Sequence, residues 1–409
     1  MTFRHVTNGK HARKMNKKNY IALFLVSLAS FLPSQAKDIR VSITNTLAHA
    51  RHELASLDAA PLRAKLAVSE TTPLRVLNQI GLEQPSQLTH DGKLIFEVCV
   101  PPKGKMTYLI QPKEPAKQPL WVFGKQYPIR KDDIAWENDR IGFRVYGPAL
   151  QQTGERSFGI DVWTKNTPIP VFSKRYLDDW RGNIQEDSLR KAGLNAQADS
   201  INRATSFHLD HGNGMDAYGV GPTLGCGAPA LMGPKGLIFP YCYRDFRILD
   251  NGPLRFTLRL DFAPNAEGIT EHRLISLDKG SHFNRMTVWY DGIKSPIQLA
   301  SGIVLHGESD LTLGDRFICY ADPTDRPETW GSLIFTGILY PDGIDEIARF
   351  EHLNHALGIK NGYRGEPFTY YFGAAWSRYD VPTFAHWTLE STQFLDNLKH
   401  SFIITIEKQ

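Results

Sequence analysis

The stretch Leu254-Arg255-Phe256-Thr257-Leu258-Arg259-Leu260-Asp261-Phe262 decides the fold class, because apolar and polar residues alternate strictly along it. Successive side chains of a β-strand point to opposite faces, so this pattern is typical of a strand with one buried face and one wet face. The same alternation recurs at 141–145 and at 158–162. These runs predict a protein built mainly of antiparallel strands.

The rest of the chain supports a mostly β protein with few helices. Further strand-like runs lie near 286–290, 302–306 and 332–340, whereas helical periodicity is confined to the segments 187–202, 344–357 and 393–399. Because long helices do not alternate with the strands, a doubly wound fold and a TIM barrel are disfavoured. With 409 residues, 42% of them hydrophobic, the chain is able to bury a large core.

Residues 1–36 have the features of a secretory signal peptide. A basic stretch ends at Lys18, an apolar run follows from Tyr20 to Leu32, and Ser34-Gln35-Ala36 places small residues where signal peptidase cleaves. The apolar run is shorter than the roughly 20 residues that a membrane-spanning helix needs. We therefore expect a periplasmic or secreted protein that has no membrane attachment after cleavage.

The predicted cleavage also changes the charge of the protein. The full chain carries a formal charge of +4, but six of its 47 basic residues lie within the first 18 positions and no acidic residue precedes Asp38. Removing those six leaves 41 basic against 43 acidic residues, a formal charge of about −2. This balance argues against a broad phosphate-binding face, so we expect no nucleic-acid partner.

Residues 37–115 predict a small β-sandwich module. Ile39–Ile43 alternates, and Leu94–Val100 is an apolar run bounded by turn residues. The proline-rich stretch Gln111–Pro119 has no periodicity and is the expected linker. The predicted organisation is therefore a signal peptide at 1–36, an N-terminal module at 37–115 and a large β domain at 120–409 that carries the functional site.

The glycine-rich stretch Phe207–Gly227 is the densest group of residues able to perform chemistry. Six glycines between positions 212 and 227 indicate positive φ angles or close backbone approaches. The stretch also carries His208, His211, Asp216 and Tyr218, which supply a base, an orienting carboxylate and a phenolic proton donor. It matches no phosphate-binding loop, dinucleotide fingerprint or serine nucleophile elbow. We expect either a catalytic loop or a structural loop whose polar side chains satisfy backbone amides.

Cofactor and disulfide predictions stay open. We expect no cofactor, although His208, Asp210, His211 and Asp216 together allow a divalent metal site. The four cysteines fit no zinc spacing. Cys226 and Cys242 are sixteen positions apart, and they form either a disulfide or, with Cys99 and Cys319, buried free thiols.

Two aromatic segments are candidates for sugar binding. In Trp136-Glu137-Asn138-Asp139-Arg140, a ring, two acids and a guanidinium suit a pyranose with a carboxylate, because the ring stacks and the arginine grips the acid in a bidentate way. The alternative is a turn with a solvated ion pair. Trp376 and Arg378, in the aromatic stretch 370–379, extend such a cleft if they are exposed and belong to the core otherwise.

Three motifs together carry a resemblance to a known family. The run Trp136–Pro148, the loop His211–Gly227 and the segment Ile275–Ser281 resemble secreted bacterial proteins known only as a domain of unknown function. Members are typically encoded among polysaccharide-utilisation genes, near glycoside hydrolases that remove unsaturated uronates. The resemblance implies an Ig-like module followed by a mutarotase-like β-supersandwich, and it implies pectin-like or marine uronate-containing glycans as partners.

The leading functional hypothesis is a lyase that cleaves acidic oligosaccharides by β-elimination. That reaction needs a base, a cation that neutralises the uronate carboxylate and a proton donor to the leaving oxygen. We assign His211 or His208 as base, Arg140 as clamp and Tyr218 as donor, with Asp216 orienting a histidine. The alternatives are a glycoside hydrolase that uses Glu137 and Asp216 as paired carboxylates, and a glycan-binding protein without catalysis.

Overall fold

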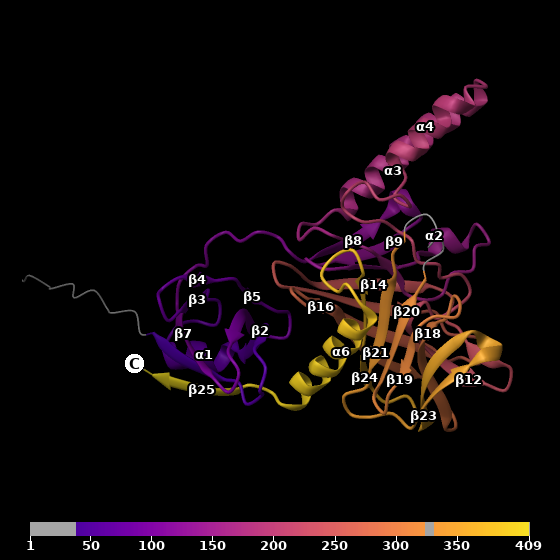
Figure 1. The fold of residues 1–409 in the computed structure, drawn as a ribbon. Helices are drawn as coiled ribbons and strands as arrows, with labels where there is room; N and C mark the ends of the chain where they lie inside the picture. Colours follow the sequence, from indigo (N-terminus) through magenta and orange to yellow (C-terminus); the bar gives the residue numbers. More distant parts are fainter. Residues whose placement is uncertain (1–37, 324–330, 409) are drawn as a thin grey trace, which may run out of the picture. The chain divides into compact units, whose positions relative to one another are not determined.

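The computed structural model describes residues 38–323 and 331–408, so the predicted signal peptide at 1–36 lies outside the described residues. A small two-sheet sandwich comes first (Figure 1), with strand orders β25-β1-β7-β3-β4 and β2-β6-β5. Apolar residues of both sheets and of helix α1 share one core. Its elements are β1 (Ile39–Thr44), β2 (Arg51–Asp58), α1 (Ala59–Leu66), β3 (Arg75–Asn78), β4 (Glu83–Gln84), β5 (Ser86–Leu88), β6 (Lys93–Val100), β7 (Lys105–Gln111) and β25 (Ile403–Lys408).

The last strand of the chain returns to this small sandwich. β25 pairs with β1 in an antiparallel register that runs from Ile39 opposite Lys408 to Thr44 opposite Ile403. The predicted division at about residue 115 falls between β7 and β8, but the return of β25 makes the module discontinuous in sequence. The sequence gives no sign of this, because the pattern of a strand does not say which sheet it joins.

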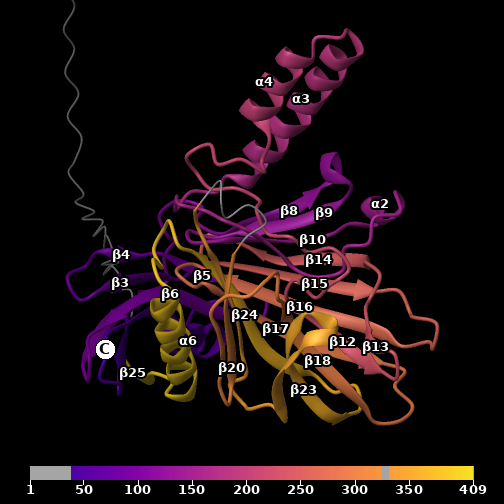
Figure 2. The ribbon, with the colours of Figure 1, turned by 45° about the vertical axis from the view of Figure 1, so that its right-hand side comes forward.

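Three antiparallel sheets form the rest of the fold (Figures 1 and 2). Sheet I has the order β14-β15-β16-β17-β24-β21-β20-β19, sheet II the order β13-β12-β18-β23-β22, and sheet III the order β11-β10-β9-β8. One apolar core runs through all three. The strands are β8 (Phe123–Tyr127), β9 (Asp133–Glu137), β10 (Gly142–Val145), β11 (Asp161–Trp163), β12 (Cys226–Gly233), β13 (Gly236–Ile238), β14 (Tyr243–Asn251), β15 (Arg255–Phe262), β16 (Thr270–Asp278), β17 (Phe283–Asp291), β18 (Ile297–Val304), β19 (Leu311–Leu313), β20 (Phe317–Asp322), β21 (Ile334–Leu339), β22 (Glu346–Phe350), β23 (His355–Tyr363) and β24 (Phe368–Trp376).

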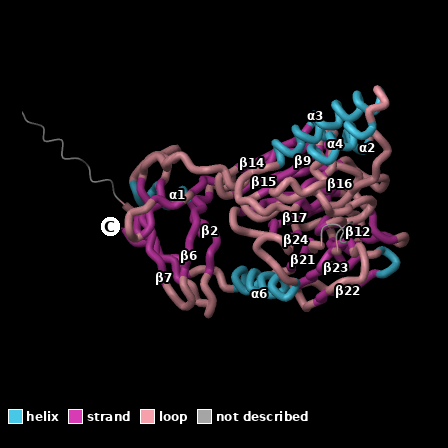
Figure 3. Tube along the Cα trace, turned by 45° about the horizontal axis from the view of Figure 1, so that its top comes forward, coloured by secondary structure: helices cyan, strands magenta, loops and turns pink. Residues whose placement is uncertain are grey.

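The mostly β prediction is confirmed, and the helices lie outside the sheets. Among the described residues, the remaining helical elements are η1 (Pro128–Arg130), α2 (Pro148–Gln151), α3 (Phe172–Lys191), α4 (Asn195–Thr205), η2 (Glu351–Leu353) and α6 (Phe384–Lys399). α6 packs on one face of sheet I through Trp387 and Phe394 (Figure 3). None of the described helices is long and apolar enough to cross a bilayer.

Helical periodicity predicted the helices only in part. The segment 187–202 lies across α3 and α4, which separate at Gly193 in the left-handed region with φ of 76°. The helix expected at 344–357 is wrong, because this segment forms β22, η2 and the start of β23. β22 pairs with β23 along its whole length, so tertiary pairing overrides the local periodicity.

Candidate functional site

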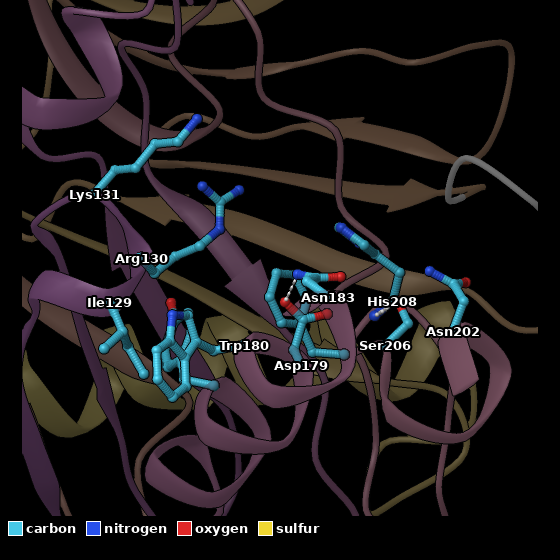
Figure 4. Close-up of a pocket in the computed structure, with 11 residues that line it drawn as sticks. Ile129, Arg130, Lys131, Asp179, Trp180, Asn183, Asn202, Ser206 and His208 are labelled. Carbon is cyan, nitrogen blue, oxygen red and sulfur yellow. Dashed lines mark hydrogen bonds between the residues drawn. The ribbon is translucent and has the colours of Figure 1, made fainter. Parts of the chain in front are cut away.

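A cavity of about 420 Å³ opens between η1, the hairpin formed by α3 and α4, and the first residues of the glycine-rich stretch. Cations, an indole, amides, a carboxyl and an imidazole line it. In Figure 4 Arg130 and Lys131 lie on one side, His208 on the other, and Asp179 between them. The lining residues are Ile129, Arg130, Lys131, Tyr176, Asp179, Trp180, Asn183, Asn202, Ser206, Phe207 and His208.

The buried carboxylate of Glu137 fixes the start of the hairpin. It accepts hydrogen bonds from the backbone amides of Val171 (2.9 Å) and Phe172 (2.8 Å), which open α3, and it pairs with Lys165 at 2.7 Å. The first amides of a helix lack intrahelical partners and carry a positive partial charge, so a carboxylate stabilises this end. α4 then packs closely on α3, because a Cβ on Gly182 would overlap the side chain of Thr205.

The two cations of the cavity come from a strained turn. Lys131 and its neighbour Asp132 both have positive φ, 53° and 66°, although neither is glycine. The Tyr243 hydroxyl donates to the Asp132 carbonyl and helps to hold this backbone. Such a conformation is costly for a residue with a side chain, and it occurs more often where side chains must be aimed at a ligand.

His208 presents one ring nitrogen that is ready to accept a proton. Its Nδ1 lies 3.0 Å from the carbonyl oxygen of Asp216, and its side chain is 55% exposed. A carbonyl oxygen only accepts, so Nδ1 carries the proton of the neutral ring and Nε2 keeps its lone pair. The Asp216 carboxylate lies 3.8 Å from the same Nδ1.

Beneath His208 lies a buried cluster of one cation and three acids. Arg144 pairs with Asp161, with Asp216 at 2.9 Å and with Asp133 at 4.0 Å. Burial raises the pKa of Asp161 to about 8 and that of Asp133 to about 6, against the opposing effect of Arg144. Because one guanidinium cannot neutralise three carboxylates, this cluster retains a proton at neutral pH.

Asp179 is the carboxyl that lines the cavity. Burial raises its pKa, although the Phe207 amide, His208 and Asn183 oppose the shift. Its Oδ2 accepts a hydrogen bond of 2.9 Å from Asn183. A carboxyl with a raised pKa is a better proton donor near neutral pH, so the cavity combines a base at His208 with an acid at Asp179.

Two residues predicted to bind substrate lie inside the fold instead. Trp136 is fully buried and donates from Nε1 to the Asn284 side chain at 2.8 Å, so its ring cannot stack on a sugar in this structure. Glu137 is committed to the start of α3. Asp139 accepts from the Gly280 amide at 2.7 Å and holds a turn. Trp136 and Glu137 have no solvent-exposed side because β9 is covered on both of its faces.

Arg140 belongs to an ion network rather than to the cavity beside His208. It pairs with Asp380, which also lies 3.2 Å from Nε2 of His282. Nδ1 of His282 contacts Glu390 on α6. Burial alone would lower the pKa of His282, but Glu390 and Asp380 overcome this and raise it to about 9. These contacts tie α6 to the turns of the sheets.

The second aromatic segment does not extend a cleft. Trp376 is 1% exposed and belongs to the core, so it offers no stacking surface. The exposed Arg378 lies with its guanidinium 6.0 Å from the centre of the Trp376 ring. Neither residue lines the cavity beside His208.

The other predicted catalytic residues, His211 and Tyr218, do not line the cavity beside His208. Nε2 of His211 lies 2.8 Å from the Ser206 carbonyl and closes the loop on itself. Tyr218 is buried, with its ring 5.2 Å from that of His306, and burial raises its pKa well above the usual value. Tyr218 is therefore poorly suited to donate a proton. Of the predicted quartet, the structure brings together His208 and Asp216.

Two glycines of this stretch, Gly214 and Gly225, serve close packing. A Cβ on Gly214 would overlap the carbonyl of Thr164, and one on Gly225 would overlap the carbonyl of Ile160. Both partners border or adjoin β11, so these two glycines let the stretch run against the edge of sheet III. Gly212, in contrast, has open space where a Cβ would lie.

The proposed metal and disulfide sites are absent from the described residues. Asp210 accepts from the amides of Gly212 and Gly214 at 2.9 Å each, which turns it away from a shared site. No group of three His, Cys, Asp or Glu in the described ranges is arranged to hold a metal ion, so the alternative of a divalent metal site gains no support there. All four cysteines are free thiols, but only Cys226 and Cys319 are buried, whereas Cys99 is exposed and Cys242 is half-buried.

Sequence analysis missed Arg130, Lys131, Asp179 and Trp180. One feature of the sequence pointed weakly to a site here: Trp180 is a large aromatic residue in an otherwise polar segment, next to Asp179. Its 42% exposure, unusual for an indole, appears only once α3 is placed.

The fold and site thus define an antiparallel, multi-sheet β protein with a polar cavity at an added helical hairpin. The chain belongs to the family described as Domain of unknown function (DUF4861), which matches residues 43–402. The family resemblance seen in the sequence is therefore confirmed. A relative, Uncharacterized protein P7 of Formosa agariphila, is 26% identical over 310 residues, 70% of each chain.

Two solved structures from Enterococcus faecalis are similar in three dimensions. One is an alpha-mannosidase, with a TM-score of 0.48, 8% identity and coverage of 90% of this chain and 46% of that one. The other is a protein in the Glycosyl Hydrolase Family 38, with a TM-score of 0.47, 6% identity and coverage of 91% and 48%. This chain spans about half the length of these proteins, and similarity at this level does not establish its activity.

Proposed function

We propose that the protein is an exported carbohydrate-active enzyme that binds acidic oligosaccharides in the cavity beside His208 and cleaves them by β-elimination. The observation that carries the proposal is the fixed tautomer of His208, whose Nε2 is left as a base in a cavity with two cations. Arg130 and Lys131 neutralise a uronate carboxylate, and the partly exposed ring of Trp180 stacks on an adjacent sugar ring.

In the proposed elimination, His208 acts as the base and Asp179 as the acid. Nε2 of His208 removes the proton from the carbon next to the carboxylate, and the released electron pair forms a carbon–carbon double bond. The bond from the neighbouring carbon to the glycosidic oxygen breaks, and Asp179 protonates that oxygen. Arg130 stabilises the negative charge that develops on the carboxylate.

Elimination fits the cavity better than hydrolysis by paired carboxylates. Hydrolysis needs two carboxyl groups that flank the bond, and Asp179 is the one carboxyl among the lining residues, all of which are described. The pair considered from sequence, Glu137 and Asp216, is buried and engaged with Lys165 and Arg144.

The test uses purified protein and oligogalacturonates or other uronate oligosaccharides. We expect absorbance near 235 nm to rise as the double bond forms, with a loss of about 10²–10⁴-fold in kcat for His208→Ala. The exposed His386 on α6 provides a matched control, and His386→Ala keeps full activity. If new reducing ends form without a rise in absorbance near 235 nm, the reaction is hydrolysis and not elimination. If the oligosaccharide binds but neither signal appears, the protein is a glycan-binding protein without catalysis.

A further inference from the structure

A second cavity, of about 490 Å³, lies where strands of sheets I and II end, and it shares no lining residue with the cavity beside His208. The contributing strands β12 to β17 are labelled in Figure 2. Aromatic, proline and aliphatic side chains dominate the lining. The lining residues are Pro148, Leu231, Ile238, Phe239, Pro240, Tyr241, Cys242, Tyr243, Arg244, Phe262, Ala263, Pro264, Asn265, Ile269, Glu271 and Tyr290.

The interior of this second cavity presents no unbalanced charge. Glu271 is 5% exposed, receives hydrogen bonds from Arg273 and from the Tyr290 hydroxyl, and has a pKa raised by burial. Burial also raises the pKa of Cys242 to about 11, so this thiol is neutral. Arg244 is exposed and pairs with the neighbouring Asp245. A charged ligand therefore finds no counter-ion inside.

The Tyr290 hydroxyl lines this cavity and has spare hydrogen-bonding capacity. It donates to Glu271 at 2.9 Å, so its oxygen still has a lone pair for a ligand donor. Arg273 donates to the same carboxylate but is not among the lining residues.

The aromatic lining supplies flat surfaces at the mouth. Tyr241 is 61% exposed at the rim, and its hydroxyl lies 3.3 Å from the Gln151 carbonyl, which restrains the ring. Phe239 stacks on Phe158 at 5.3 Å and is held by it. Rigid aromatic faces beside a few hydroxyl partners fit a ring with C–H groups on one face and hydroxyls around its edge.

We propose that this second cavity binds an uncharged sugar ring, which makes it a second carbohydrate site that is independent of the reaction at His208. Acidic and neutral sugars then occupy different places on one protein. The two cavities differ in the charge that they offer, cationic beside His208 and neutral beside Glu271.

The experiment is a paired binding measurement on the full chain. The neutral probe is methyl β-D-galactopyranoside, followed by saturation-transfer NMR and calorimetry, and the acidic probe is a uronate oligosaccharide. We expect Tyr241→Ala to weaken binding of the neutral probe at least tenfold and to leave the acidic probe unchanged. Trp180→Ala, which also removes an exposed ring, should weaken binding of the acidic probe and leave binding of the neutral probe unchanged. Tyr290→Phe keeps the ring but removes the hydroxyl, and it should weaken binding of the neutral probe severalfold.

Three results would overturn the second site. One is a neutral probe that does not bind while p-cresol does, because the occupant is then an apolar aromatic molecule. Another is loss of neutral binding in Trp180→Ala, which places that sugar in the first cavity. The third is a folded Tyr241→Ala protein, checked by its melting temperature, that retains wild-type affinity. None of these results depends on whether the protein eliminates uronates.

Discussion

Removing the imidazole of His282 tests the ion network that joins α6 to the sheets. His282 is 1% exposed and lies between Glu390 and Asp380, and Asp380 also pairs with Arg140. The pKa of His282 in the folded state is about 9, compared with about 6.5 in an unfolded chain. One pKa unit corresponds to about 1.4 kcal/mol, so the shift represents about 3 kcal/mol of stability.

The sign of the pH dependence follows from the direction of the shift. A histidine whose pKa is raised by folding contributes its full stability below about pH 6.5 and loses it as the pH rises through about 9. The variant His282→Gln does not titrate here. We therefore expect the difference in unfolding free energy between wild type and variant to shrink by about 3 kcal/mol between pH 6 and pH 10.

The assay is urea unfolding at pH 6, 8 and 10, with NMR titration of the His282 ring as a second measurement. His386→Gln replaces an exposed histidine on α6, so it serves as control and should show no pH-dependent difference. A gap between wild type and His282→Gln that stays constant over this range would refute the assignment of a buried imidazolium, even if the variant is less stable at every pH.

Three further predictions concern the framework of the site. Glu137→Gln leaves the buried Lys165 without its counter-ion, so we expect the unfolding free energy to fall by about 3 kcal/mol in urea unfolding. A decrease of less than about 1 kcal/mol would contradict the ion pair. Gly225→Ala places a Cβ against a carbonyl at φ of 58° and should destabilise clearly more than Gly212→Ala, which has open space; equal melting temperatures would argue against close packing there. Folding raises the pKa of Asp161 to about 8, so the unfolding free energy falls as the pH rises from about 4 to 8. Asp161→Asn should reduce this pH dependence in urea unfolding curves. An unchanged pH dependence would mean that another carboxyl of the cluster retains the proton.

Sequence analysis predicted the strands better than the site. The alternation at 254–262 became β15, with Phe256, Leu258 and Leu260 fully buried, because one face of that strand meets the core. The same reasoning failed at 136–140, because β9 is covered on both faces and residue type alone does not tell a sugar-binding indole from a core indole. Exposure depends on neighbours from distant segments, which local periodicity does not record.

The candidate site could also be predicted only in part from the sequence. His208 was found because the glycine-rich stretch is unusual in sequence, although two of its glycines, Gly214 and Gly225, serve to approach β11. Its partners in the cavity come from η1 and α3. Glu137 anchors α3 to sheet III, and Arg144 holds Asp216, which contacts His208. These two contacts place the lining residues and His208 around the same cavity. Residues that the sequence marked as functional therefore act as the supports of the cavity. The groups that face a ligand are ordinary surface residues whose significance arises only from where these supports place them.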